Sequence, residues 1–213
     1  MDKGMMDDFL DRSDELHIEI LGLLGGVQAY PGLRHEVALV ACGIALEHAL
    51  SLRLLVRTSC YTSALSLIRL QYESLTRGVW LMYAATDLQV QKLASPLTLE
   101  AEKFARKMPM FKDMLDEVVK TAPDQASRML MGFKEVNYHA MNSYVHSGIH
   151  PLRRHAEGYP LELIKDVVKN SNGLNVMTFQ LASILSGDPR FSGSMKVLQE
   201  EFHQILPGLI SPL

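Results

Sequence analysis

Three charged residues share one face of a mostly apolar stretch, Cys60 to Met82 (CYTSALSLIRLQYESLTRGVWLM). Arg69, Glu73 and Arg77 are spaced four residues apart, so a helix places them in one row. Because an isolated buried charge is strongly unfavourable, such charges must be paired or must face a polar cavity. The spacing predicts either an internal ladder in which Glu73 holds both arginines, or one wall of a cleft in which an arginine binds phosphate or carboxylate.

A second polar group is the heptapeptide Asn142-Ser143-Tyr144-Val145-His146-Ser147-Gly148. We expect it to end a helix, with Gly148 as the terminating glycine, so that His146 lies in the last turn, where the helix dipole favours the imidazolium. Imidazole is a common general acid or base, and Asn142, one turn earlier, would orient the ring or contact a phosphate. The alternative is a structural helix end with a satisfied histidine.

A third group follows at once, in the stretch HPLRRHAEGYP, which the sequence predicts to be a basic loop. A solvated loop is the simplest interpretation. The other interpretation is a local phosphate-binding patch beside His146. Its binding residues would be His139, Tyr144, His150, Arg153 and Arg154.

The first two groups resemble a set of bacterial helical proteins of unknown function, whose central helix reads R-x-x-[YF]-E-x-x-x-R-G-x-W and whose later helix ends in [NS]-x-Y-x-H-x-G. Here these blocks run from Arg69 to Trp80 and from Asn142 to Gly148, together 19 of the 213 residues. The set is similar to the HEPN superfamily of helical bundles. Many HEPN proteins are metal-independent ribonucleases in toxin–antitoxin and antiphage systems, and they typically dimerise to place two R-x(4–6)-H motifs across one cleft.

The resemblance implies that His146 occupies the catalytic histidine position, in a homodimer that needs no cofactor. The sequence departs from the pattern at the arginine, because His139, Ala140 and Met141 fill the window where one is expected. Arg69, Arg77 or the Arg153-Arg154 pair would have to replace it. Some HEPN-like domains are non-catalytic interaction modules.

The composition limits the classes of function. The chain has 213 residues, 47% of them hydrophobic and 21% charged, with a net charge of −3, so any nucleic-acid contact needs a local basic patch. Cys42 and Cys60 lack the spacing of a zinc or redox motif and are predicted to be free, buried thiols in a reducing cytosol. The apolar run from Ala38 to Val56 is interrupted by charged residues, which favours a core helix over a membrane span.

Helical periodicity dominates the chain, and no segment alternates like a strand. We therefore predict one all-α domain over residues 1–213, an up-and-down bundle of about five long helices. The predicted helices cover 7–24, 33–57, 60–85, 124–146, 160–185 and a last stretch after Asp188-Pro189. Residues 87–123, rich in charge and interrupted by Pro96 and Pro109, are predicted to be an insertion of short helices over one end of the bundle.

Three functional hypotheses follow from these residues. The first is a metal-independent endoribonuclease in which His146 moves the proton and an arginine stabilises the phosphate. The second is a non-catalytic module that binds a partner protein, a nucleotide or RNA through the Arg/His cleft. The third is a mononuclear metal site, which requires that His48, His139 and His146 converge.

Overall fold

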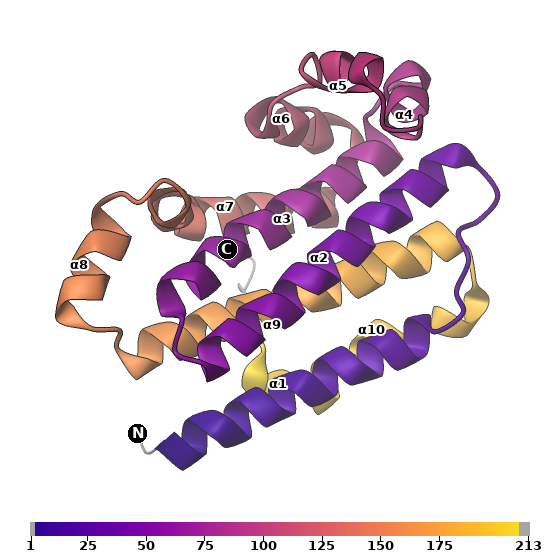
Figure 1. Cartoon of the computed structure of the whole chain (residues 1–213). Coiled ribbons are helices and arrows are strands. Elements are labelled where there is room, and N and C mark those ends of the chain that lie inside the picture. The colour runs from indigo at the N-terminus through magenta and orange to yellow at the C-terminus, as the bar shows by residue number, and fades with distance from the viewer. Residues whose placement is uncertain (1–2, 209–213) are drawn as a thin grey trace.

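The computed structural model describes residues 3–208, and every regular element in that range is helical (Figure 1). Four long helices lie side by side: α1 (Lys3–Leu24), α2 (Leu33–Arg57), α3 (Tyr61–Tyr83) and α9 (Leu161–Ser186). A fifth, α7 (Asp124–Val145), packs on α3. The predicted all-α fold class is therefore confirmed.

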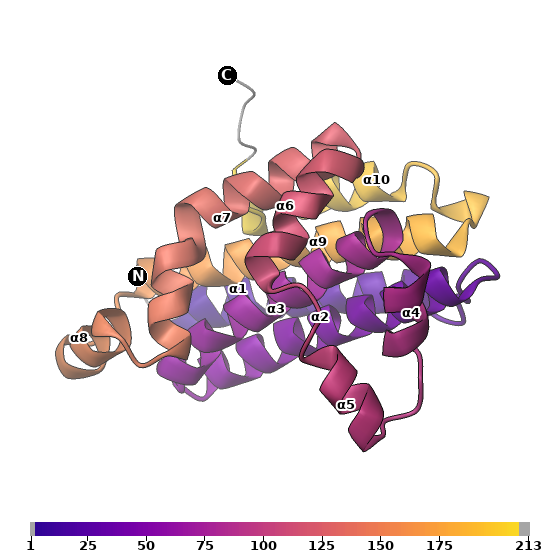
Figure 2. The same ribbon diagram turned by 90° about the horizontal axis from the view of Figure 1, so that it is seen from above.

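Short helices occupy the two ends of this body. The segment α4 (Asp87–Leu93), α5 (Leu99–Ala105) and α6 (Phe111–Thr121) lies at the end where α3 finishes, and α8 (Ile149–Glu157) lies at the other (Figures 1 and 2). The short elements η1 (Pro189–Phe191), α10 (Ser194–Glu201) and η2 (His203–Ile205) follow α9.

Local sequence explains several helix ends. Thr86 and Gln89 form a reciprocal capping box at the start of α4, and the Thr98 hydroxyl accepts from the Ala101 amide at the start of α5. At the start of α3, by contrast, Cys60 occupies the N-cap position and no side-chain capping bond forms there.

The main core lies between α2, α3 and α9, where Tyr72, Trp80, Leu52 and Leu185 are buried. The helix α6 belongs to this core, since Met114, Leu115 and Val118 are buried in it, whereas α5 buries no residue. A second apolar cluster joins α1 to α9 and α10. It consists of Leu16, Ile20, Leu46, Val176, Phe179, Leu198, Phe202 and Ile205.

The expected basic loop after Gly148 is a helix, α8, with Pro151 at its third position. A proline fits there because the first four amides of a helix have no partner inside the helix, so its missing N–H is not lost. The residue that ends α7 in the left-handed conformation is Ser147 (φ 52°) and not Gly148. Gly148 is needed for space instead: a Cβ on it would lie 2.6 Å from the Ser143 hydroxyl.

Other expectations are also corrected. The stretch after Asp188 is broken into short elements at Gly193, whose φ is +85°. Gly173 lies inside the continuous helix α9 and gives room for Pro207, whose Cγ would lie 2.8 Å from an added Cβ. Cys42 is buried as expected, but Cys60 is exposed because it sits in the turn between α2 and α3.

By length and composition alone, α2 could cross a membrane. Nine of its residues, among them Ala45, Leu52 and Arg53, are nevertheless buried in the bundle. The same test is passed by the core helix of a water-soluble protein.

Candidate functional site

Arg69 joins α3 to α7. Its Nε and Nη2 donate to Oε1 of Glu73 at 2.9 and 2.5 Å, and its Nη1 donates to Oδ1 of Asn142 at 2.6 Å. The side chain of Arg69 is 11% exposed. All three nitrogens of the guanidinium are therefore engaged, and the cation is neutralised within its own helix.

Aromatic rings cover the rest of this guanidinium. Its central carbon lies 4.7 Å from the ring centre of Tyr138 and 5.2 Å from that of Phe111. The two rings stack on each other at 6.1 Å, and Phe111 packs edge-on against Tyr72, whose hydroxyl donates to the Leu130 carbonyl. This arrangement fixes Arg69 as a structural contact between α3, α6 and α7.

Only half of the predicted ladder forms. Glu73 pairs with Arg69, and within residues 3–208 no ion pair or hydrogen bond joins it to Arg77, which is half-buried one turn further on. The glycine that follows Arg77 in the sequence block has a packing role. A Cβ on Gly78 would lie 2.9 Å from a Leu181 methyl, so this position lets α3 approach α9.

His146 and His139 do not join the Arg69 cluster. Both rings are exposed on α7, and Asn142, expected to orient the His146 ring, instead uses its oxygen for Arg69. His146 is the C-cap residue, and its backbone amide donates to the Asn142 carbonyl. The structure thus brings together Arg69, Glu73 and Asn142, and leaves His146 one turn away at the surface.

The α7–α8 corner, which we define as residues 139–156, is the most basic part of the candidate site. This stretch contains Arg153, Arg154 and four histidines, with no Asp or Glu. His146, His150, Arg153 and His155 are exposed and Arg154 is half-buried. Arg153 pairs with Glu157, just beyond the corner, but both side chains are largely exposed, so the pair is weak.

Packing against α3 holds the corner in place. The Tyr144 carbonyl accepts from the Ser66 hydroxyl at 3.2 Å, and Tyr159, just after α8, shares a 2.7 Å hydrogen bond with Thr62. Tyr144 itself is buried and packs in the main core. The Ser143 hydroxyl accepts from the His150 amide at 3.0 Å, which fixes the first turn of α8 to the end of α7.

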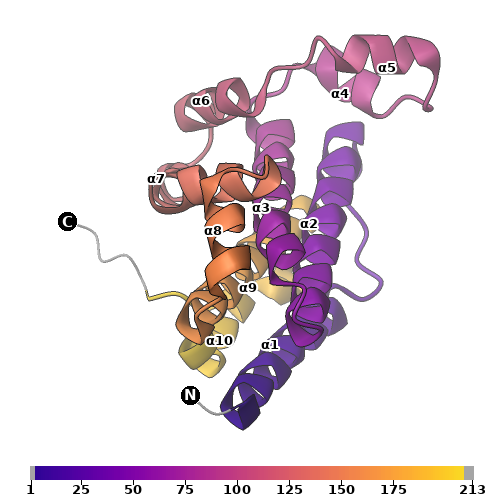
Figure 3. The same cartoon turned by 60° about the vertical axis from the view of Figure 1, so that its left-hand side comes forward.

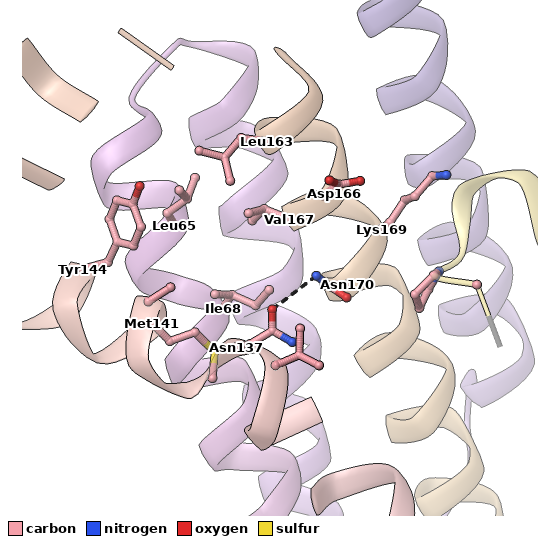
Figure 4. Close-up of a pocket in the computed structure, with 14 residues that line it drawn as sticks. Leu65, Ile68, Asn137, Met141, Tyr144, Leu163, Asp166, Val167, Lys169 and Asn170 are labelled. Atoms are coloured by element: carbon pink, nitrogen blue, oxygen red, sulfur yellow. Dashed lines mark hydrogen bonds between the residues drawn. The ribbon is translucent and has the colours of Figure 1, made fainter. Parts of the chain in front are cut away.

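A groove of about 450 Å³ lies between α7 and α9, with Leu65 and Ile68 of α3 at its base (Figure 4). The amides of Asn137 and Asn170 approach each other across it at 3.5 Å. Tyr144 is the one predicted site residue in its lining. The groove is therefore separate from the Arg/His cleft that the sequence suggested.

The metal hypothesis finds no support in the described part of the chain. No group of three or more His, Cys, Asp or Glu side chains is close enough there to hold a metal ion. His48 lies half-buried on α2, while His139 and His146 are exposed on α7. The required convergence of these three histidines does not occur.

Sequence reasoning missed a buried polar group around α1. Ser13, His17, Arg53, Gln71, Ser171, Asn172 and Asn175 are all buried. The local signal was present in α9, where Ser171, Asn172 and Asn175 interrupt the apolar stripe. Their hydrogen-bond partners come from α1, α3 and η2, which no spacing rule connects.

Comparison with known families gives one result. The sequence model of a family of unknown function, DUF6988, matches residues 42–208, which is most of the chain. The chain belongs to this family. No curated protein and no solved structure matches it at a significant level. The DUF6988 match begins inside α2 and includes the Arg69 cluster and the α7–α8 corner, whereas α1 lies outside it.

Proposed function

We propose that this DUF6988 protein is a HEPN-like helical module that binds RNA at the α7–α8 corner without cleaving it. The observation that carries the proposal is the contrast between Arg69 and the corner. Arg69 is neutralised by Glu73, engaged by Asn142 and covered by aromatic rings, so it has no free charge to offer a reacting phosphate. At the corner, by contrast, Arg153 is exposed and Arg154 half-buried, with the exposed His146, His150 and His155 around them.

The chemistry of the corner suits the phosphate backbone. Arginine donates to phosphate oxygens through its planar fork, and clustered cations on a protein of net charge −3 give a local field that attracts a polyanion. In this proposal the protein acts in the cytoplasm as a homodimer, in a toxin–antitoxin or antiphage system. Such a dimer would double the basic surface.

RNA binding is tested by fluorescence anisotropy with a labelled single-stranded RNA at several salt concentrations. Arg153→Gln/Arg154→Gln should weaken binding and reduce the slope of log K against log salt by roughly 1 to 2, because each phosphate contact contributes about 1. Arg106→Gln/Lys107→Gln is a matched control. It removes two exposed positive charges just after α5, and Arg106, like Arg153, is paired with a glutamate four residues away, so the slope should stay unchanged. Equal slopes for both variants would refute the proposal.

The second candidate is the metal-independent endoribonuclease, and one observation favours it. The His146 ring is exposed at the end of α7, beside the basic helix. Incubation of the protein with RNA in EDTA distinguishes the candidates. Cleavage that disappears in His146→Ala supports the ribonuclease, whereas binding without cleavage supports the module.

A further inference from the structure

The helix α1 is joined to the rest of the bundle by buried polar side chains as well as by apolar ones. Figure 3 shows α1 at the edge of the bundle, connected to α2 by a single loop. Leu16 and Ile20 anchor it in the second apolar cluster. Ser13 and His17 are buried on the same helix, at 0% and 4% exposure. This interface therefore depends on polar contacts that water can replace.

A chain of hydrogen bonds fixes what His17 can do. The Nε2 of Gln71 donates to the Ser171 carbonyl at 2.9 Å, and its Oε1 accepts from the Ser171 hydroxyl at 2.6 Å, which fixes the orientation of the amide. The same Nε2 therefore faces Oδ1 of Asn175, at 3.4 Å. The Asn175 Nδ2 then points at Nδ1 of His17, also at 3.4 Å. Because an NH₂ group can only donate, Nδ1 of His17 must accept, and the imidazole must be neutral.

The charged groups around His17 oppose a second proton on its ring. The buried cation of Arg53, on α2, lies near the His17 ring. The nearby anion is Asp14, on α1 itself, and its carboxylate accepts hydrogen bonds from Arg53 and Arg57. Gln71 on α3 and Asn175 on α9 are neutral. Glu201 and His203, from α10 and η2, are exposed. Burial, and then the charge of Arg53, lower the pKa of His17 from 6.5 to about 4.

Two buried polar atoms at this interface have no hydrogen-bond partner among the described residues. They are Nη2 of Arg53 and Oδ1 of Asn172, although other atoms of both side chains bind α1. An unsatisfied buried group removes part of the stability that the contact would provide. The DUF6988 match also leaves α1 outside. Thr76 on α3 also has an unsatisfied buried hydroxyl, so incomplete pairing alone is not special to α1. What distinguishes α1 is the buried Arg53–Asp14 ion pair and the buried His17, together with its position outside the family match.

We propose that α1 is a releasable helix whose docking is controlled by proton binding to His17. In acid, Nδ1 of His17 gains a proton and becomes a donor. The N–H groups of His17 and Asn175 then face each other, so the hydrogen bond between them is lost. The charged imidazolium is also a second buried cation near Arg53. The helix α1 then leaves α2 and α9 while the rest of the bundle stays folded. Its departure uncovers Leu46, Phe179 and Phe202, an apolar surface that is hidden at neutral pH.

The direction of the pH dependence follows from the lowered pKa. The docked state binds the proton less well than released α1, so docking is strongest above about pH 6.5 and weakens as the pH falls towards 4. With these two pKa values, the docking equilibrium falls by about 60-fold between pH 7 and pH 4.5. The pKa of Asp14 is also lowered, because hydrogen bonds from Arg57 and Arg53 outweigh its burial, so its own contribution is lost only at still lower pH.

Hydrogen–deuterium exchange of the full chain tests this proposal. Protection, expressed relative to an unstructured chain at the same pH, is measured for peptides of α1 and α3 at pH 7 and pH 4.5. We expect α1 protection to fall by about 60-fold and α3 protection to change far less. His17→Gln, which cannot titrate but can still accept from Asn175, should keep α1 protected at pH 4.5.

His139→Gln, which removes an exposed histidine on α7, is the control and should behave like the wild type. Equal loss of protection in α1 and α3 of the wild-type protein would overturn the proposal, and that comparison holds even if His17→Gln does not fold. The proposal also fails if α1 of His17→Gln loses as much protection as wild-type α1.

Discussion

Arg53 and Arg69 lie on neighbouring helices, and each is ion-paired, but their partners come from different distances along the chain. Arg69 uses Glu73, four residues away on the same helix, and then reaches Asn142. Arg53, only 1% exposed, uses Asp14 on α1, 39 positions earlier, at 2.6 Å. The first pair is available as soon as α3 is helical, whereas the second exists only while α1 is docked.

The two arginines also differ in how completely they are satisfied. Each nitrogen of Arg69 has an acceptor and its faces are covered by Tyr138 and Phe111. Arg53 leaves Nη2 without a partner in the described structure, and burial, opposed by Asp14, lowers its pKa. We conclude that the junction of α3 and α7 is a permanent part of the bundle, and that the α1 interface is conditional.

The largest effect should come from Asp14→Asn. It leaves the buried Arg53 cation without its counter-ion, so we expect the opening free energy of α1 to fall by roughly 3 kcal/mol. Amide exchange of α1 at neutral pH measures it. The control is Asp11→Asn, one turn earlier: Asp11 is 66% exposed and touches only Arg57, so less than about 1 kcal/mol should be lost. Equal effects would show that Arg53 does not depend on Asp14.

A smaller effect is expected from Glu73→Gln. The change removes the charge that neutralises Arg69, but Asn142, the aromatic faces and partial solvent contact remain, so the loss should be about 2 kcal/mol. Urea unfolding followed by the fluorescence of Trp80, the one tryptophan, measures it. Arg77→Gln should stay within about 0.5 kcal/mol. If Arg77→Gln destabilises as much as Glu73→Gln, the two-arginine ladder is correct after all.

The smallest expected effect is the coupling free energy between the Arg53–Asp14 and Arg69–Glu73 ion pairs. They share no hydrogen-bond partner, so the effects of Asp14→Asn and Glu73→Gln on the amide exchange of α3 should add to within about 0.5 kcal/mol in the double variant. A coupling above about 1 kcal/mol would mean that α1 and the Arg69 cluster act as one unit, which would remove the distinction drawn between them.

The helices were the most predictable part of this protein. The range 33–57 was predicted from periodicity and the flanking turns, and α2 has those bounds. The α8 helix was missed because Pro151 was expected to prevent any helix directly after Gly148, although proline is tolerated in a first helical turn. Whether a proline breaks a helix depends on its position within that helix.

The candidate site was predictable in part. Spacing gave the contact between Arg69 and Glu73, because residues four apart meet on any helix. It could not show that Glu73 leaves Arg77 unpaired, or that Asn142 turns to Arg69 and away from His146, since side-chain choice among several partners depends on how α6 and α7 pack on α3.

The sequence alone determined that the chain is helical, where most helices begin and end, and which charges meet within a helix, because these depend on residues a few positions apart. Only the tertiary structure decided that Arg53 pairs with Asp14, that His17 is buried as a neutral ring against Asn175, and that the basic residues of α8 stay at the surface. Those outcomes depend on which helices pack together. Burial by another helix changes the free energy of a charged group far more than contacts with residues close in sequence do.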